Sequence, residues 1–206
     1  MKSVVGIALL CALVTSGCVS TRPVIQPAPA PLVARCDATQ AQLSREADQR
    51  ASPWNIEKHV ATNFQGRQVS WLMKDSAYQT FVIQTNAKNF GRCIDTGCYL
   101  FAAPATVIHR AVQESMKDGK HDPEMIGKAL GLPAKNFEGT LRMMTLDLDA
   151  SGVCVRLPVE SDPGVWKCTS AEDTDCFKFG GYTSGGVPEV MVINAPVEQA
   201  RVEEVP

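Results

Sequence analysis

The residue best placed to do chemistry is Glu189, which stands between a glycine-rich segment and a β-branched run. Residues 180–186 are GGYTSGG and residues 187–192 are VPEVMV. Glycines permit positive φ angles and a close approach of the backbone to a ligand. A carboxylate fixed at the start of a strand is able to act on a sugar hydroxyl or to stabilise a cationic transition state. A tight glycine turn that feeds an edge strand explains the same residues without chemistry, and we favour that simpler interpretation.

The cysteines are the second group with chemical meaning. Six of them follow the N-terminal segment, and an even set in an exported chain indicates disulfide bonds. We expect three bonds among Cys36, Cys93, Cys98, Cys154, Cys168 and Cys176. Spacing favours the local pairs Cys93–Cys98 and Cys168–Cys176, which leaves Cys36–Cys154, although sequence alone does not choose among the possible connectivities. The alternative is a metal site, but the cysteines lack the two-residue spacing of zinc knuckles, so we expect no metal.

Other patterns for metals or nucleophiles are weaker. The three histidines, His59, His109 and His121, show no metal spacing, and the chain has neither a Gly-x-Ser-x-Gly elbow nor a Walker loop. Residues 147–152, DLDASG, imitate the start of an EF-hand calcium loop, but its twelfth position is Pro158 instead of glutamate. A hairpin turn explains the same six residues without calcium.

The N-terminus predicts where the protein works. Lys2 precedes an apolar run over residues 4–14 that is too short to span a bilayer, as in a secretory signal peptide. The following Thr-Ser-Gly-Cys18 resembles the lipobox of bacterial lipoproteins, although Thr15 replaces the commoner leucine. This resemblance implies that Cys18 is acylated, for example with palmitate, and becomes the mature N-terminus. The alternative is an ordinary signal that leaves Cys18 as one more thiol. No aspartate follows Cys18, which favours the outer membrane.

Composition and charge define the class of protein. Hydrophobic residues make up 45% of the 206 residues and charged residues 20%, which is typical of a globular domain. The net charge of −2, without a basic cluster, indicates no nucleic-acid surface. We therefore expect a signal peptide over residues 1–17, a Pro/Ala-rich tether over 18–35 that favours polyproline II, and a single globular domain over 36–206.

The expected elements are of both kinds. Helices are predicted from Asp37 to Ala51, from Ser52-Pro53 to Gly66, from Pro104, and from Asp122-Pro123. Strands are predicted at residues 69–72, 78–83, 140–148, 152–157 (paired with 140–148) and 187–193, with a hairpin at 166–179. Residues 196–205 are expected to form a short strand or an extended tail, and residues 93–103 an irregular segment or a further strand pinned by a disulfide bridge. The fold class is therefore α+β, with N-terminal helices, two central helices and an antiparallel sheet mainly from the C-terminal half, stapled by disulfides.

A second resemblance concerns the C-terminal part. Residues 130–133, LGLP, with the later strands and VPEV, resemble ADP-ribosyltransferase-class bacterial toxin domains. The resemblance implies that Glu189 contacts the nicotinamide ribose and that NAD is the cofactor. The early Arg or His of that family and its Ser-Thr-Ser strand are not in place, and NAD is scarce outside the cytoplasm.

These observations favour a binding or interaction module over an enzyme. We expect an outer-membrane-anchored lipoprotein, facing the periplasm or the surface, that binds a protein, an envelope polymer or a small ligand. Its lipid holds it at the membrane, and neither nucleic acid nor a cofactor is expected. The alternative is an ADP-ribosyltransferase-like toxin or effector domain that uses Glu189 and NAD.

Overall fold

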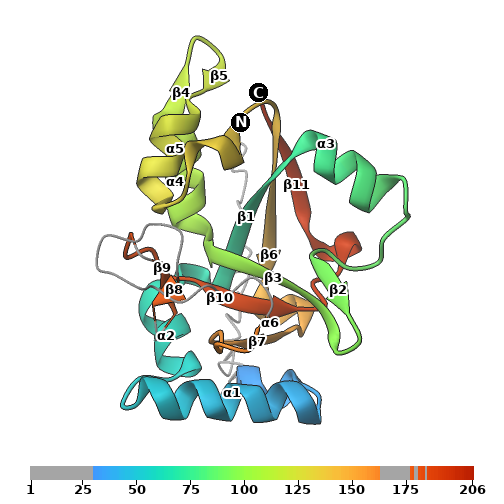
Figure 1. The fold of residues 1–206 in the computed structure, drawn as a ribbon, viewed down its shortest axis with the longest axis vertical. Helices are drawn as coiled ribbons and strands as arrows, with labels where there is room; N and C mark the ends of the chain where they lie inside the picture. Colours follow the sequence, from blue (N-terminus) through green and yellow to red (C-terminus); the bar gives the residue numbers. More distant parts are fainter. Residues whose placement is uncertain (1–29, 163–176, 179–180, 184) are drawn as a thin grey trace, which may run out of the picture.

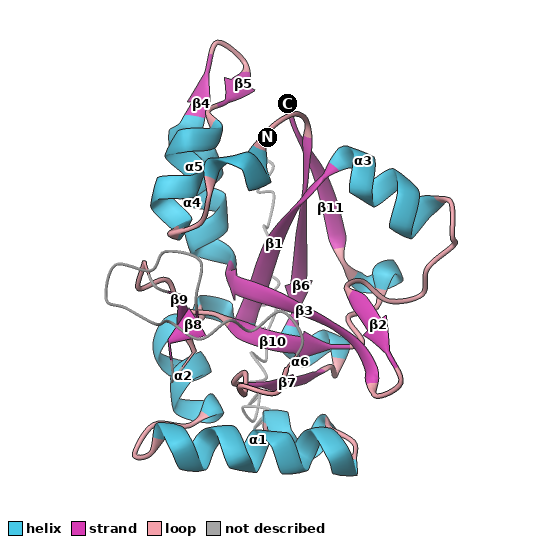
Figure 2. Cartoon of the chain, in the orientation of Figure 1, coloured by secondary structure: helices cyan, strands magenta, loops and turns pink. Residues whose placement is uncertain are grey.

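The structure, a computed structural model, describes residues 30–162, 177–178, 181–183 and 185–206. Within them the chain combines helices with an antiparallel sheet, which confirms the predicted α+β class (Figure 1, Figure 2). The signal peptide, Cys18, most of the tether, most of the hairpin predicted at 166–179 and the pair Cys168–Cys176 lie outside the described residues.

The described part of the sheet has seven antiparallel strands in the order β11-β6-β1-β3-β10-β7, with β2 beside β3. Their bounds are β1 Gln68–Lys74, β2 Arg92–Ile94, β3 Gly97–Pro104, β6 Leu141–Asp147, β7 Cys154–Arg156, β10 Val190–Ile193 and β11 Arg201–Val205. β1 and β3 pair only through Val69↔Pro104 and Ser70↔Ala103. The two halves of the sheet therefore cross steeply at this corner (Figure 2).

Side chains alternate between the two faces of this bent sheet, as the strand period requires. One face builds the main core with helix α2 (Ile56–Asn63). Its sheet residues are Val69, Trp71, Leu100, Ala102, Met144, Leu146, Val155, Val190 and Val192. The opposite face packs on helices α4 (Ala105–Ser115) and α5 (Pro123–Leu130). This second core includes Ala103, Ile108, Ala111, Ile126, Leu130, Phe137, Leu141, Met143 and Val187. The sheet is thus covered on both sides.

The longer helices begin at side-chain caps or at a proline. They are α1 Ala38–Ala51, α2 Ile56–Asn63, α4 Ala105–Ser115 and α5 Pro123–Leu130. The predicted caps at Asp37 and Asp122 are confirmed, because their side chains accept hydrogen bonds from the backbone N–H of Gln40 and of Glu124 and Met125. The shorter elements are η1 Leu32–Arg35, η2 Gln65–Arg67, α3 Asp75–Tyr78, η3 Gln79–Ile83, β4 Met116–Lys117, β5 Lys120–His121, η4 Ala134–Phe137, α6 Leu148–Ser151, β8 Phe177–Lys178, β9 Tyr182–Thr183 and η5 Val197–Gln199.

The strand predicted at residues 78–83 is wrong, because α3 and η3 make this stretch helical. Tyr78 and Val82, four residues apart, pack on the main core, whereas Phe81 and Ile83 are 66% and 51% exposed. A strand would put the intervening Thr80 on the same side as Tyr78 and Val82, but Thr80 is exposed, as helical spacing requires. Packing of these two side chains on the core therefore overrides the strand propensity of the β-branched and aromatic residues in this stretch.

The second helix begins later than predicted. Asn55, instead of Ser52, caps α2 by accepting a hydrogen bond from Lys58 N at 2.9 Å. Asp48 of α1 accepts a further bond from Ile56 N at 2.9 Å. Two free N–H groups at the helix start are thus satisfied from both sides, which fixes α2 against α1.

The predicted pairing of residues 140–148 with 152–157 is also wrong. β6 pairs with β1 and β11, and β7 pairs with β10 at the other end of the sheet. Residues 147–152 form the helical turn α6 instead of a hairpin, and Asp147 caps it by accepting from Asp149 N and Ala150 N. Because a helical turn redirects the chain, the second strand leaves its predicted partner.

The carboxylates of this turn are already engaged. Asp149 forms ion pairs with Arg35 and Arg67, each at 2.9 Å, which hold its pKa below the ordinary value against the effect of burial. The residues that imitated a calcium loop thus serve a capped turn and a surface charge cluster.

The packed structure begins before Cys36. Leu32 is fully buried, and its N–H donates to Glu57 Oε1 at 2.6 Å. Arg35 donates to the carbonyl of Leu148 in addition to its ion pair. Leu32–Arg35, which the sequence assigned to the tether, therefore belong to the folded domain.

A buried ion pair at the edge strand β7 is linked to α1 by a hydrogen bond. Arg156 is 1% exposed and donates to both carboxylate oxygens of Asp162, at 2.6 and 2.5 Å. Its Nε donates to Gln40 Oε1 at 2.8 Å. Because the guanidinium is fully paired, its burial is tolerated.

The structure contains two of the expected disulfides, Cys36–Cys154 and Cys93–Cys98. The first ties the segment before α1 to β7, and the second joins β2 to β3. Their sequence separations of 118 and 5 residues differ greatly.

This difference predicts unequal contributions to stability. In the chain-entropy model, removing the long-range bond by Cys36→Ala/Cys154→Ala costs about 5 kcal/mol, and removing the short one by Cys93→Ala/Cys98→Ala costs about 2 kcal/mol. The free energy of unfolding in urea, measured for both double variants, tests the ranking. Equal losses, or a larger loss for the Cys93–Cys98 pair, would contradict it.

Candidate functional site

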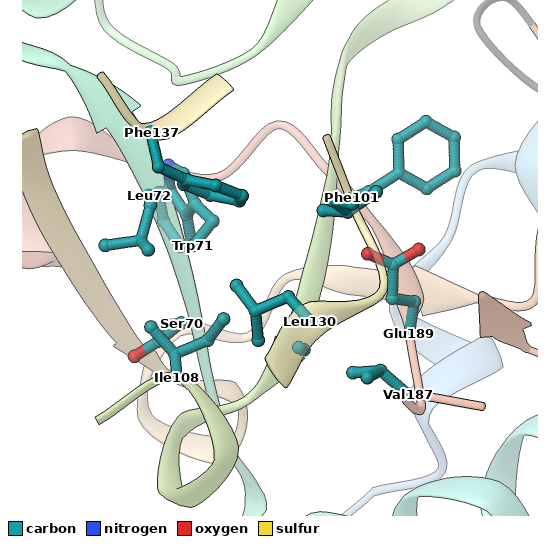
Figure 3. A pocket seen from close by; sticks show the side chains of 11 residues that line it. Ser70, Trp71, Leu72, Phe101, Ile108, Leu130, Phe137, Val187 and Glu189 are labelled. Carbon is teal, nitrogen blue, oxygen red and sulfur yellow. The ribbon is translucent and has the colours of Figure 1, made fainter. Parts of the chain in front are cut away.

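A cavity of about 140 Å³ lies between the second face of the sheet and the elements that cover it (Figure 3). Its walls come from β1, β3, α4, α5, η4 and the segment before β10. The residues that line it are Ser70, Trp71, Leu72, Phe101, Ala103, Ile108, Leu130, Leu132, Phe137, Val187 and Glu189. An apolar cavity of roughly 150 Å³ holds a benzene molecule, so this one has room for a single ring or a branched alkyl group.

Glu189 is the one ionisable side chain among these lining residues. The other polar groups in the wall are few. Ser70 contributes a hydroxyl, whereas the ring of Trp71 packs against Phe90 in the main core, with centroids 5.2 Å apart. In Figure 3 the Glu189 carboxylate lies at the same end of the cavity as Phe101, and Ser70 and Ile108 lie at the other end.

The backbone of Glu189 is fixed on both sides. Its N–H donates to the carbonyl of Gly181 at 2.7 Å, and its carbonyl lies 3.1 Å from Nε2 of His59. The residue stands just before β10, where the strand leaves the loop. The side chain is therefore aimed from a rigid position.

Burial raises the pKa of the Glu189 carboxyl from 4.5 to about 7. Desolvation disfavours the charged form of a carboxyl group. Near neutral pH the group is consequently present in both protonation states. A carboxyl with such a pKa is suited either to proton transfer or to a charge-dependent contact with a ligand.

His59 of α2 holds the loop in place. The indole N–H of Trp54 donates to His59 Nδ1 at 3.1 Å, so Nδ1 is the acceptor and Nε2 carries the proton donated to the Glu189 carbonyl. The ring is fully buried, and burial lowers its pKa to about 4 despite its hydrogen bonds to the carbonyls of Glu189 and Gly181. His59 is thus a neutral positioning residue.

The glycines of the loop are required by packing within the chain. At Gly181, with φ of +83°, an added Cβ would lie 2.8 Å from His59 Nε2 and 2.9 Å from the carbonyl oxygen of Glu189. An added Cβ at Gly185 would lie 2.6 Å from Cα of Gly131, the residue that ends α5. The glycines were expected to let a ligand approach the backbone closely. In the structure His59 and the end of α5 occupy these close positions instead.

A second polar cluster borders the cavity. Ser70 Oγ and Thr145 Oγ1 lie 2.7 Å apart on paired residues of β1 and β6, and His109 Nε2 of α4 lies 3.0 Å from Thr145 Oγ1. The sequence analysis missed this group. Its only signal was a polar residue at an inward position in each of two otherwise apolar strands. The three side chains satisfy one another and anchor α4 to the sheet.

The remaining predicted residues lie elsewhere. Cys36–Cys154 belongs to a small cluster with Tyr99 and Met191, and Cys93–Cys98 closes the β2–β3 hairpin. The ring nitrogens of His121 lie 2.7 Å from the carbonyl oxygens of Pro206 and Phe137. Of the residues singled out in the sequence, the structure brings Glu189 and His59 together.

No protein-family model, curated protein or solved structure shows significant similarity to the chain. Within the described ranges, no helix combines the length and the apolar character needed to cross a bilayer. The site must therefore be interpreted from its own chemistry.

The shifted pKa values of Glu189 and His59 predict how the free energy of unfolding depends on pH. The folded pKa of Glu189 is raised, so the folded state binds more protons between pH 4.5 and 7, and stability falls as pH rises through that range. The folded pKa of His59 is lowered, so its contribution is complete above pH 6.5 and is lost as pH falls towards 4. The two slopes oppose each other in the wild-type protein.

The substitution Glu189→Gln removes the titrating carboxyl group and, with it, the fall in stability between pH 4.5 and 7. We expect the stability of the variant, relative to wild type, to rise by up to about 3 kcal/mol between pH 4.5 and 7. Urea denaturation at a series of pH values measures this difference. The exposed Glu198→Gln is the matched control and is expected to show no such trend. A difference for Glu189→Gln that does not vary with pH would refute the assignment.

Proposed function

We propose that the protein is an exported, lipid-anchored binding module whose ligand site is the apolar cavity at Glu189. The observation that carries the proposal is a desolvated carboxyl group that enters a cavity with otherwise uncharged walls. Ligand sites are typically apolar cavities with a few placed polar groups. The cavity is small, so it takes a side-chain-sized group of a partner or a small molecule.

The proposed location rests on the N-terminal sequence. The signal peptide and Cys18 favour acylation and attachment to the outer membrane, with the domain held in the periplasm or at the surface by the tether. The bonds Cys36–Cys154 and Cys93–Cys98 support an oxidising compartment, because structural disulfides persist mainly there.

An ADP-ribosyltransferase that uses Glu189 and NAD is the less favoured alternative. Its support is the place of Glu189 just before a late strand and a pKa near 7, which suits a general base. The discriminating feature is a second carboxylate, an arginine or a stacking aromatic in the cleft. The described lining residues supply aromatic rings, namely Trp71, Phe101 and Phe137, but neither a second carboxylate nor an arginine. A cavity of about 140 Å³ holds one ring of a dinucleotide and not the whole molecule.

Benzene is a direct probe of the cavity. We expect saturable shifts of the backbone amide signals around Ala103 and Val187 in NMR titrations of the wild-type domain. Ala103→Leu, which places three more carbons in the cavity wall, should weaken binding at least tenfold. Ala38→Leu makes the same change at the exposed start of α1 and serves as control. Absence of benzene binding, or binding that Ala103→Leu leaves unchanged, would overturn the proposal.

A further inference from the structure

The Glu189 carboxylate has no protein partner among the described residues. Burial is the one cause that shifts its pKa, with no contribution from a hydrogen bond or a neighbouring charge of the described chain. Glu189 is partly buried, and ionising a carboxyl group in an apolar cavity without a partner is costly. A carboxyl with a pKa perturbed in this way, in a cavity, is a candidate functional group.

The buried arginine of the described sheet residues is already neutralised. Arg156 of β7 stands opposite Met191, two residues after Glu189, but it is held by both oxygens of Asp162 and by Gln40. Lys128 of α5, the helix that supplies Leu130 to the cavity wall, is exposed. Neither of these cations compensates the charge of Glu189, so the carboxyl is neutralised either by a proton, as its raised pKa shows, or by a cation that a ligand supplies.

We infer that the ligand of this cavity is a primary amine on a short apolar body, bound with its ammonium group against Glu189. This inference rests on the proposed function and names its ligand class. The apolar body occupies the space between Ile108, Leu130 and Val187, and the ammonium group meets the carboxylate at the Phe101 end (Figure 3). An aromatic ring beside the carboxylate adds favourable contact with a cation.

Neutral and anionic ligands fit the cavity less well. An anion would face a negative group in a medium of low dielectric constant, where like charges repel strongly. A neutral alcohol would bind only through a hydrogen bond, which is worth less than a hydrogen bond between charged groups. Charge is thus the property by which the site selects among ligands of equal shape.

Three probes of nearly equal shape test the inference: benzylamine, benzyl alcohol and ethylbenzene. At pH 8, where both Glu189 and benzylamine are charged, titration calorimetry or NMR gives their affinities. We expect Glu189→Gln to weaken benzylamine about ten- to a hundredfold while changing ethylbenzene less than threefold. Glu198→Gln is the matched control and should leave all three affinities unchanged. Glu189→Asp retains the charge and should keep a preference for benzylamine over benzyl alcohol.

The outcomes separate this inference from the proposed function. If ethylbenzene binds but Glu189→Gln affects all three probes equally, the amine inference is wrong and the binding cavity stands. If none of the probes binds, the proposed function fails as well. Phenylalanine amide and its N-acetyl derivative distinguish sources of the amine: binding of only the free-amine form points to a peptide N-terminus, and binding of benzylamine alone points to a small free amine. Both support an ammonium ligand.

Discussion

The hydrogen bond from His59 to the carbonyl of Glu189 is the contact on which the site depends. It joins helix α2 to the loop before β10, which are 130 residues apart in sequence. The neutral imidazole is fixed by Trp54, and Gly181 leaves the space that it fills. Because the backbone of Glu189 is held in this way, its side chain is directed into the cavity, where desolvation changes its chemistry.

The bend of the sheet creates the space for that side chain. β1 and β3 share only two residue pairs, so the strands on either side diverge, and α4 and α5 cover the face on which they separate. The cavity lies in this wedge, next to the Ser70–Thr145–His109 cluster that anchors α4. Two long-range contacts, the Cys36–Cys154 disulfide and the hydrogen bond from Arg156 to Gln40, hold the far edge of the sheet.

Local signals in the sequence predicted local structure well. The caps at Asp37 and Asp122, the short bridge at Cys93–Cys98 and the strand after Glu189 depend on neighbouring residues. The predictions were wrong where contacts between residues distant in sequence determine the secondary structure or the strand pairing. Residues 78–83 are helical because two side chains reach the core, and β7 leaves β6 because a capped turn redirects the chain. The cavity walls come from six segments, so no single stretch of sequence revealed them, although Glu189 itself was identifiable.

The central claim is that Glu189 carries a desolvated carboxyl group inside a cavity. NMR titration of the side-chain carboxyl carbons in ¹³C-glutamate-labelled protein measures this directly, with the Glu189 signal assigned by its loss in Glu189→Gln. Our account predicts a midpoint near 7 for this signal. A midpoint near the ordinary value of 4.5 would show that the carboxyl is solvated, and it would contradict both the site and its proposed preference for amines.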